Sequence, residues 1–180
     1  MKRTINHILL IFTATLMLVS CNDGASLQRY FVDNQESKNF ITQDVPISML
    51  KIDASKFTNE QKEAYNSVSR LNFLGYKTSE ADDKTLKVEL AKVKTILSDE
   101  KYNDLIEFSD KGNKVVVKYI GTDEEADEVI VFGSSKELGF GIVRVLGNEM
   151  SPDKMVTLVS ILQSADIDKG QVQDIMKFFK

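Results

Sequence analysis

Hydrophobic residues recur along this chain at two spacings, one typical of helices and the other of strands. The clearest helical pattern starts near Asp83, where Leu86, Leu90, Val93 and Leu97 follow one another at intervals of four, three and four residues. These intervals place the four side chains on one face of a helix. Similar patterns predict helices over residues 26–37, 58–69 and 99–108, a short helical turn over 47–51, and helices starting at 151 and 168.

Runs of β-branched and aromatic residues predict strands over 40–45, 71–77, 114–120, 128–132 and 138–146. The last three follow one another with short polar connections, which favours antiparallel hairpins. The order of elements predicts an α+β fold: a mostly antiparallel sheet of four to five strands with helices packed mainly on one face. No linker or low-complexity stretch divides the chain, so residues 27–180 are expected to form a single domain.

The strand predicted over 138–146 carries an unusual set of small residues. Gly139, Gly141 and Gly147 share one face of it with Val143 and Val145. A nucleotide-binding loop would instead place its glycines between a strand and a helix. We therefore expect a face that lets a helix approach closely, or a bulge.

The first twenty residues have the plan of a secretory signal peptide. Lys2 and Arg3 precede an apolar run over 8–19, and the small residue Ser20 follows it. The run spans only twelve residues, whereas a membrane-spanning helix needs about twenty. A removed signal peptide is therefore favoured over a retained membrane helix.

Cys21 makes this signal more specific, because a cysteine directly after the cleavage point is the mark of a bacterial lipoprotein. We predict cleavage between Ser20 and Cys21, lipid attachment to the Cys21 sulfur, and a short polar tether over 21–26. Two or more acyl chains would make the membrane anchoring stable. The protein is expected outside the cytoplasm in the cell envelope, with the outer membrane favoured over the inner.

Cleavage would also remove side chains that catalytic and metal-binding sites commonly use. His7 is the only histidine and Cys21 the only cysteine, and the chain contains no tryptophan. The mature chain would lack a histidine and a free thiol, which argues against nucleophilic triads and against zinc, iron or copper sites with histidine or cysteine ligands. We predict a protein that is not an enzyme and needs no cofactor or metal.

The charge balance points away from nucleic acids. The chain has 23 basic and 27 acidic residues, and loss of Lys2 and Arg3 with the signal leaves 21 basic residues and a net charge of −6. No basic run stands out, so no nucleic-acid partner is predicted. The expected partners are the membrane, through Cys21, and an envelope protein.

Several polar segments invite a functional interpretation. The acidic run over 123–128 and the segment over 166–170 resemble calcium loops, but neither has the required ligand spacing. We favour a solvated hairpin turn for the first and a helix cap at Asp168 for the second. Ser134-Ser135-Lys136 lacks the spacing of an acyl-transfer motif, and a glycosidase pair of carboxylates is not identifiable from the sequence.

The last two predicted helices offer the best interface hypothesis, although such apolar stripes usually belong to a core. The candidate partner face consists of Met155, Val159, Leu162, Val172 and Met176.

Several segments together resemble a family of small secreted lipoproteins, domain-of-unknown-function family 4252. They are Leu27-Gln28-Arg29-Tyr30-Phe31, Ser69-Arg70-Leu71-Asn72-Phe73-Leu74, Lys92-Val93-Lys94 with Leu97, Tyr102 with Leu105-Ile106, Gly112 with Val115-Val116-Val117, and Asn148-Glu149-Met150-Ser151. The resemblance implies an envelope protein of a bacterium with two membranes. It implies no known activity and no catalytic residues.

Together these features lead us to expect a membrane-anchored envelope lipoprotein that acts as a non-catalytic binding or interaction module. Two alternatives remain: a lipoprotein that binds a small molecule or ion against the sheet, and a carboxylate-based hydrolase of envelope polymers.

Overall fold

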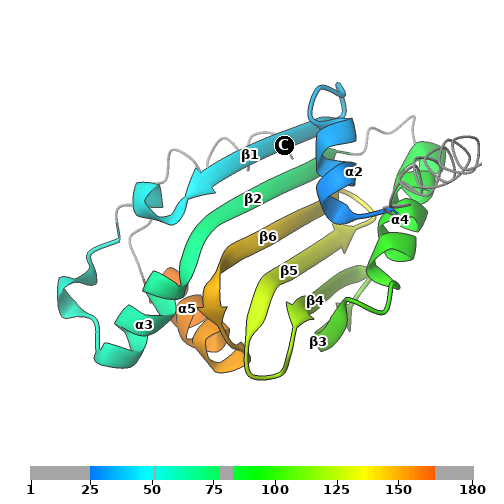
Figure 1. Ribbon diagram of the computed structural model, residues 1–180. Coiled ribbons are helices and arrows are strands. Elements are labelled where there is room, and N and C mark those ends of the chain that lie inside the picture. Colours follow the sequence, from blue (N-terminus) through cyan, green and yellow to red (C-terminus); the bar gives the residue numbers. More distant parts are fainter. Residues whose placement is uncertain (1–24, 51, 78–82, 165–180) are drawn as a thin grey trace, which may run out of the picture.

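A six-stranded antiparallel sheet forms the centre of the protein (Figure 1). The computed structural model describes residues 25–50, 52–77 and 83–164. The strands lie in the spatial order β1-β2-β6-β5-β4-β3. Their bounds are β1 (Phe40–Pro46), β2 (Val68–Lys77), β3 (Asn103–Asp110), β4 (Asn113–Gly121), β5 (Ala126–Ser135) and β6 (Gly139–Met150).

Four α-helices and two short 3-10 helices accompany the strands within the described ranges. They are α2 (Leu27–Asn34), α3 (Asn59–Ser67), α4 (Asp83–Leu97), α5 (Pro152–Ser164) and the 3-10 turns Ile47–Leu50 and Ala54–Lys56. The α+β class and the antiparallel sheet are confirmed. The capping box at Thr58 and Gln61 is also present, with the Thr58 hydroxyl accepting from the Gln61 N–H at 3.2 Å. None of the described helices is long and apolar enough to cross a membrane.

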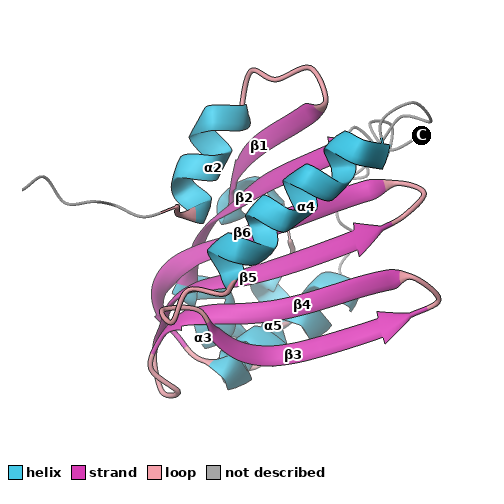
Figure 2. Ribbon diagram, turned by 90° about the vertical axis from the view of Figure 1, so that its right-hand side faces the viewer, coloured by secondary structure: helices cyan, strands magenta, loops and turns pink. Residues whose placement is uncertain are grey.

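The helices cover both faces of the sheet, so the expectation that they lie mainly on one face is wrong. Helices α2 and α4 pack on one face, and α3 and α5 on the other (Figure 2). Each face has its own core. Side chains such as Leu74 and Ile130 point to the α2/α4 face, whereas Val129 and Val145 point to the α3/α5 face. Alternation along the strands supplies both apolar layers.

The helix predicted over 99–108 is also wrong, because residues 103–110 form strand β3 at the edge of the sheet. The sheet therefore has six strands rather than four to five. A two-residue turn joins β3 to β4: Lys111 has φ of 46° and Gly112 of 88°, between the paired Asp110 and Asn113. Positive φ at both central residues matches the twist of a tight hairpin. Gly112 thus closes a hairpin and does not end a helix.

The glycine-bearing face of β6 permits a close approach, as its sequence predicts. A Cβ atom added to Gly147 would lie 1.9 Å from the carbonyl oxygen of Ser67, the last residue of α3. Only a residue without a side chain fits there. Gly147 therefore lets the chain pass from α3 into β2 directly against β6.

Candidate functional site

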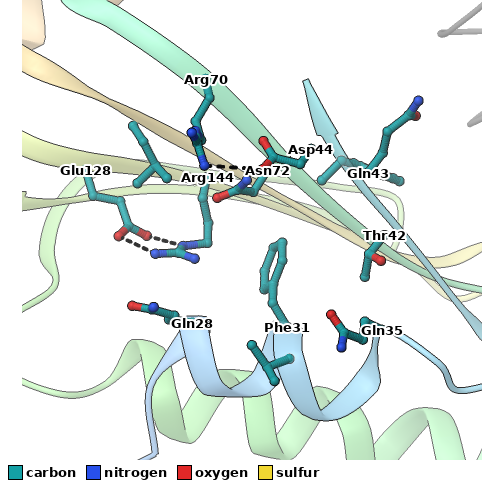
Figure 3. A pocket seen from close by; sticks show the side chains of 13 residues that line it. Gln28, Phe31, Gln35, Thr42, Gln43, Asp44, Arg70, Asn72, Glu128 and Arg144 are labelled. Atoms are coloured by element: carbon teal, nitrogen blue, oxygen red, sulfur yellow. Dashed lines mark hydrogen bonds and ion pairs between the residues drawn. The ribbon is translucent and has the colours of Figure 1, made fainter. Parts of the chain in front are cut away.

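A cavity of about 580 Å³ opens on the α2/α4 face of the sheet, between α2 and strands β1, β2, β5 and β6 (Figure 3). Its size lies within the range of about 300–1,000 Å³ that is usual for small-molecule sites. The polar side chains that converge on it are Gln28 of α2, Gln35 directly after α2, Thr42 of β1, Asn72 of β2, Glu128 of β5 and Arg144 of β6. Gln43 also borders the cavity, but its side chain points away from the others.

A buried ion pair lies at one side of the cavity. Arg144 donates from Nε to Glu128 Oε1 at 2.6 Å and from Nη2 to Glu128 Oε2 at 2.8 Å. Both residues are only 8% exposed. Arg144 stands opposite Asn72 on β2, and its guanidinium lies 5.5 Å from the centre of the Phe31 ring of α2. The bidentate bond and the aromatic contact hold the guanidinium in one orientation.

A second, exposed ion pair lies at the β1 side of the cavity. Arg70 Nη1 lies 3.4 Å from Asp44 Oδ2, and both side chains are about half exposed. Asn72 stands between the two pairs, because it is the register partner of Asp44 on β1 and of Arg144 on β6. Asn72 is therefore the central residue of a polar row, Asp44-Asn72-Arg144, that runs across β1, β2 and β6.

Helix α2 forms the opposite wall, and hydrogen bonds at its start fix its position. Ser26 caps the helix by accepting from the Arg29 N–H at 3.2 Å. The Leu27 N–H donates to the Tyr102 hydroxyl at 3.3 Å, which ties the start of α2 to the segment before β3. Burial raises the pKa of Tyr102 above its usual value. Because the apolar residues of α2 face the core, Gln28 and Gln35 can face the cavity.

A buried network joins the far side of α2 to α4. The Tyr30 hydroxyl donates to Glu89 Oε2 at 2.7 Å, and Lys92 Nζ donates to Glu89 Oε1 at 2.6 Å. Burial first, and then the hydrogen bond to Glu89 and its negative charge, raise the pKa of Tyr30 far above its usual value. The neutral Tyr30 hydroxyl therefore ties the cavity wall to α4 as a hydrogen-bond donor.

The cavity offers hydrogen bonds and little net charge. Its two arginines are paired with its two carboxylates, and the amides and the Thr42 hydroxyl are neutral. Throughout the described ranges, no buried side-chain nitrogen or oxygen lacks a partner, and no group of three or more acidic, histidine or cysteine residues could hold a metal. Such a surface suits an uncharged ligand that both donates and accepts hydrogen bonds.

The residues singled out from the sequence lie away from this cavity. Ser20, Cys21, Val172 and Met176 lie outside the described residues, as does the segment over 166–170. Val159 and Leu162 lie on α5. Met155 is 6% exposed and belongs to the core on the α3/α5 face.

Two other predicted segments lie at the ends of β5. Residues 123–125 of the acidic run lie in the connection between β4 and β5, and Asp123 accepts a hydrogen bond from the Tyr119 hydroxyl. Ser134 and Ser135 close β5, and Lys136 is an exposed residue of the following hairpin.

Sequence reasoning missed the ion pair at the cavity, although a signal was present. Arg144 alternates with Phe140 and Ile142 on the face of β6 opposite to its glycines. A charged residue at an inward position needs a partner. Glu128 belongs to the acidic run in sequence, but it lies in β5 and its side chain is buried.

A family model described as "Domain of unknown function (DUF4252)" matches residues 30–158 of the chain. The matched range begins within α2 and ends within α5, so it contains the whole sheet and every residue lining the cavity except Gln28. No curated protein and no solved structure matches the chain significantly.

Proposed function

The chain belongs to the family described as domain of unknown function DUF4252, and from this premise we propose that it is a lipid-anchored, non-catalytic binding protein of the bacterial envelope. Its site is the cavity between α2 and the sheet. Its ligand is a small, uncharged molecule with both hydrogen-bond donors and acceptors. The observation that carries this proposal is the convergence of polar side chains from α2, β1, β2, β5 and β6 on that cavity.

The ligand class follows from the charge balance of the site. A site for an anion would present unpaired cations, and a cation site would present unpaired carboxylates. Here Arg144 pairs with Glu128 and Arg70 with Asp44. The groups left for recognition are chiefly the side-chain amides of Gln28, Gln35 and Asn72, which both donate and accept. Sugar hydroxyls and peptide amides both match this chemistry.

The same pairing supports a binding role over a hydrolytic one. A glycosidase needs two carboxyl groups, one of them acting as nucleophile or base and the other as proton donor. Both oxygens of Glu128 accept hydrogen bonds from Arg144, and Asp44 lies in an exposed pair with Arg70. Neither carboxylate is arranged for such a step.

The anchor would set the position of the cavity. Helix α2 starts at Leu27, six residues after Cys21, and six residues reach at most about 20 Å. A lipid on Cys21 would therefore hold α2, and the cavity that it walls, close to the membrane surface. A ligand that belongs to the envelope is consistent with this position.

The proposal can be tested by NMR titration of the mature chain with defined probes. We expect a disaccharide or a capped dipeptide to shift resonances of α2, β1 and β2, and acetate and methylamine to leave them unchanged. The Asn72→Ala variant should weaken binding by roughly two- to tenfold, because it removes a hydrogen bond of about 0.5–1.5 kcal/mol.

Gln43→Ala provides the matched control, because it removes an amide that borders the cavity but points away from it. Equal loss of affinity in both variants, or shifts caused only by the charged probes, would contradict the proposed site.

A further inference from the structure

Strand β3 is the last strand of the sheet, and within the described ranges no strand pairs with its outer edge (Figure 2). Its inner edge is bonded to β4. No other described segment forms a backbone hydrogen bond with residues 103–110. An antiparallel strand at the edge of a sheet leaves backbone N–H and C=O groups pointing outward at alternate residues. The outer edge of β3 can therefore accept a further strand.

This edge lacks most of the features that protect exposed strands. Proteins usually block strand addition with a lysine, a proline or a bulge at the edge. Strand β3 contains no basic residue and no proline. Its single register shift lies between Asp104 and Ile106, so residues 106–110 keep a regular register with β4. The regular stretch is therefore open to pairing along its whole length.

Two large apolar side chains lie along the same stretch. Ile106 is 54% exposed and Phe108 is 61% exposed. Ile106 pairs with Val117, which packs on the α3/α5 core, and Phe108 lies on the same face because side chains alternate along a strand. Adjacent exposed apolar side chains indicate a contact surface, whereas single ones are ordinary. Here they lie directly beside the unpaired backbone edge.

The opposite face of β3 is acidic. Lys114 Nζ lies 2.6 Å from Glu107 Oε1, and Lys118 Nζ lies 2.7 Å from Asp104 Oδ1. Both carboxylates are more than half exposed, so each can also meet a cation from the outer side. Strand β4 thus shows which pattern complements β3, with lysines on one face and valines on the other.

We propose that the outer edge of β3 binds an extended segment of a partner protein in which basic and apolar residues alternate. The segment would add a strand to the sheet, and its main-chain hydrogen bonds would supply much of the affinity. Its apolar side chains would lie beside Ile106 and Phe108 on one face. Its basic side chains would lie beside Asp104 and Glu107 on the other, as those of β4 do from the inner side.

A second copy of this chain fits the edge poorly. Two antiparallel β3 edges that place Ile106 opposite Phe108 also place Glu107 opposite its own copy and Asp104 opposite Asp110. Like charges directly opposite each other destabilise a strand pair. The acidic edge therefore favours a basic partner over self-association.

NMR titration of the full mature chain tests the proposal. The probe is a peptide with the sequence of residues 114–120, acetylated and amidated, because this segment already pairs with β3 from the inner side. We expect shifts in β3 and its neighbour β4. We also expect several-fold slower exchange of the amide protons of residues 106–110 that point away from β4.

The matched control is the same peptide with its backbone amides N-methylated. It keeps both lysines and the apolar side chains but has no backbone N–H to donate. It should bind roughly tenfold or more weakly, because several hydrogen bonds are lost.

Two substitutions in the protein locate the contact. Phe108→Ala should weaken binding of the unmethylated peptide several-fold, because it removes apolar surface beside the added strand. Met49→Ala removes a side chain that is 56% exposed and follows β1, at the other edge of the sheet. This control variant should bind the peptide as the wild type does.

Absence of slowed exchange in residues 106–110, or equal binding of the N-methylated peptide, would overturn the proposal. Equal effects of Phe108→Ala and Met49→Ala would also overturn it. Slow exchange of the same amide protons without peptide, in a dimer that forms at high concentration, would overturn it by identifying a second copy as the occupant. Ligand binding in the cavity is a separate readout, because its shifts are expected in α2, β1 and β2.

Discussion

Glu128 accepts two hydrogen bonds from Arg144, at 2.6 and 2.8 Å, from the neighbouring strand of the sheet. Each side chain compensates for the buried charge of the other, and together they form one side of the cavity. The desolvation free energy of either charge is therefore offset only while its partner is present. Loss of either residue should therefore affect both the stability of the fold and the shape of the cavity.

Removal of one member of this pair should destabilise the fold strongly. We expect Glu128→Ala to lower the free energy of unfolding by about 3–5 kcal/mol, because it leaves the Arg144 charge buried and unpaired. The double variant Glu128→Leu/Arg144→Met should recover most of this loss. Asp44→Ala breaks an exposed pair and should cost less than about 1 kcal/mol. Urea denaturation measures all three, and similar losses for Glu128→Ala and Asp44→Ala would contradict the argument.

Tyr30 should make stability fall at alkaline pH. Its pKa is raised in the folded state by burial and by Glu89, so above about pH 10 only the unfolded chain releases this proton readily. The stabilisation is complete below that pH and is lost progressively as the pH rises further. Tyr30→Phe should flatten the fall, as measured by the midpoint of urea unfolding against pH. A fall in stability that is equally steep in Tyr30→Phe and the wild type would contradict this assignment.

Gly147 should not tolerate a side chain. The methyl group of Gly147→Ala would lie 1.9 Å from the Ser67 carbonyl oxygen, and relief of this clash requires movement of the backbone. We expect a loss of about 1–3 kcal/mol or more in the free energy of unfolding. Gly133→Ala, where nothing lies within 4 Å, should cost less than about 1 kcal/mol. Thermal unfolding followed by circular dichroism would detect the difference, and equal costs would refute it.

The β3–β4 turn offers a stabilising substitution. Lys111 has φ of 46°, a conformation that asparagine adopts more easily than lysine. Lys111→Asn creates the preferred pair of residues for this turn and should raise the free energy of unfolding by about 0.5–1 kcal/mol. Asp110→Asn adds the same side chain beside the turn, where φ is not positive. It should give no gain, and the turn argument fails if both variants stabilise the protein equally.

Lipid attachment at Cys21 is open to a direct test. Cys21→Ala should move the protein from the membrane fraction to the soluble fraction and abolish labelling by a radioactive fatty acid, because the predicted acylated sulfur is absent. Asn22→Ala retains the cysteine and should stay with membranes. A Cys21→Ala variant that still sediments with membranes would refute the predicted anchor.

The helix wrongly predicted over 99–108 shows where local patterns fail. Tyr102, Leu105 and Ile106 have helical spacing, yet most of this segment is an edge strand that packs mainly on β4. Its structure depends on pairing with residues up to sixteen positions away, such as Tyr119 with Asn103. A tertiary contact of this kind overrides weak helical propensity. By contrast, α4 carries a long periodic pattern, and its prediction is confirmed.

The cavity could not be predicted because its residues come from five elements that the topology brings together. Asn72 and Arg144 are 72 positions apart in the chain, but they are register partners because β6 inserts between β2 and β5. The local sequence around either residue indicates only a strand. The inward position of Arg144 was a usable signal for a buried pair, but it did not identify Glu128.

The sequence alone determined the α+β class, the family, the capped helices and the hydrophobic faces, because these depend on contacts within a few residues or on composition. It also leads to the prediction of a lipid anchor, which rests on a short local motif. Only the tertiary structure decided that helices cover both faces, that a sixth strand exists and that a charge-balanced cavity forms under α2. These features depend on strand order and register, which are set by the packing of the whole chain.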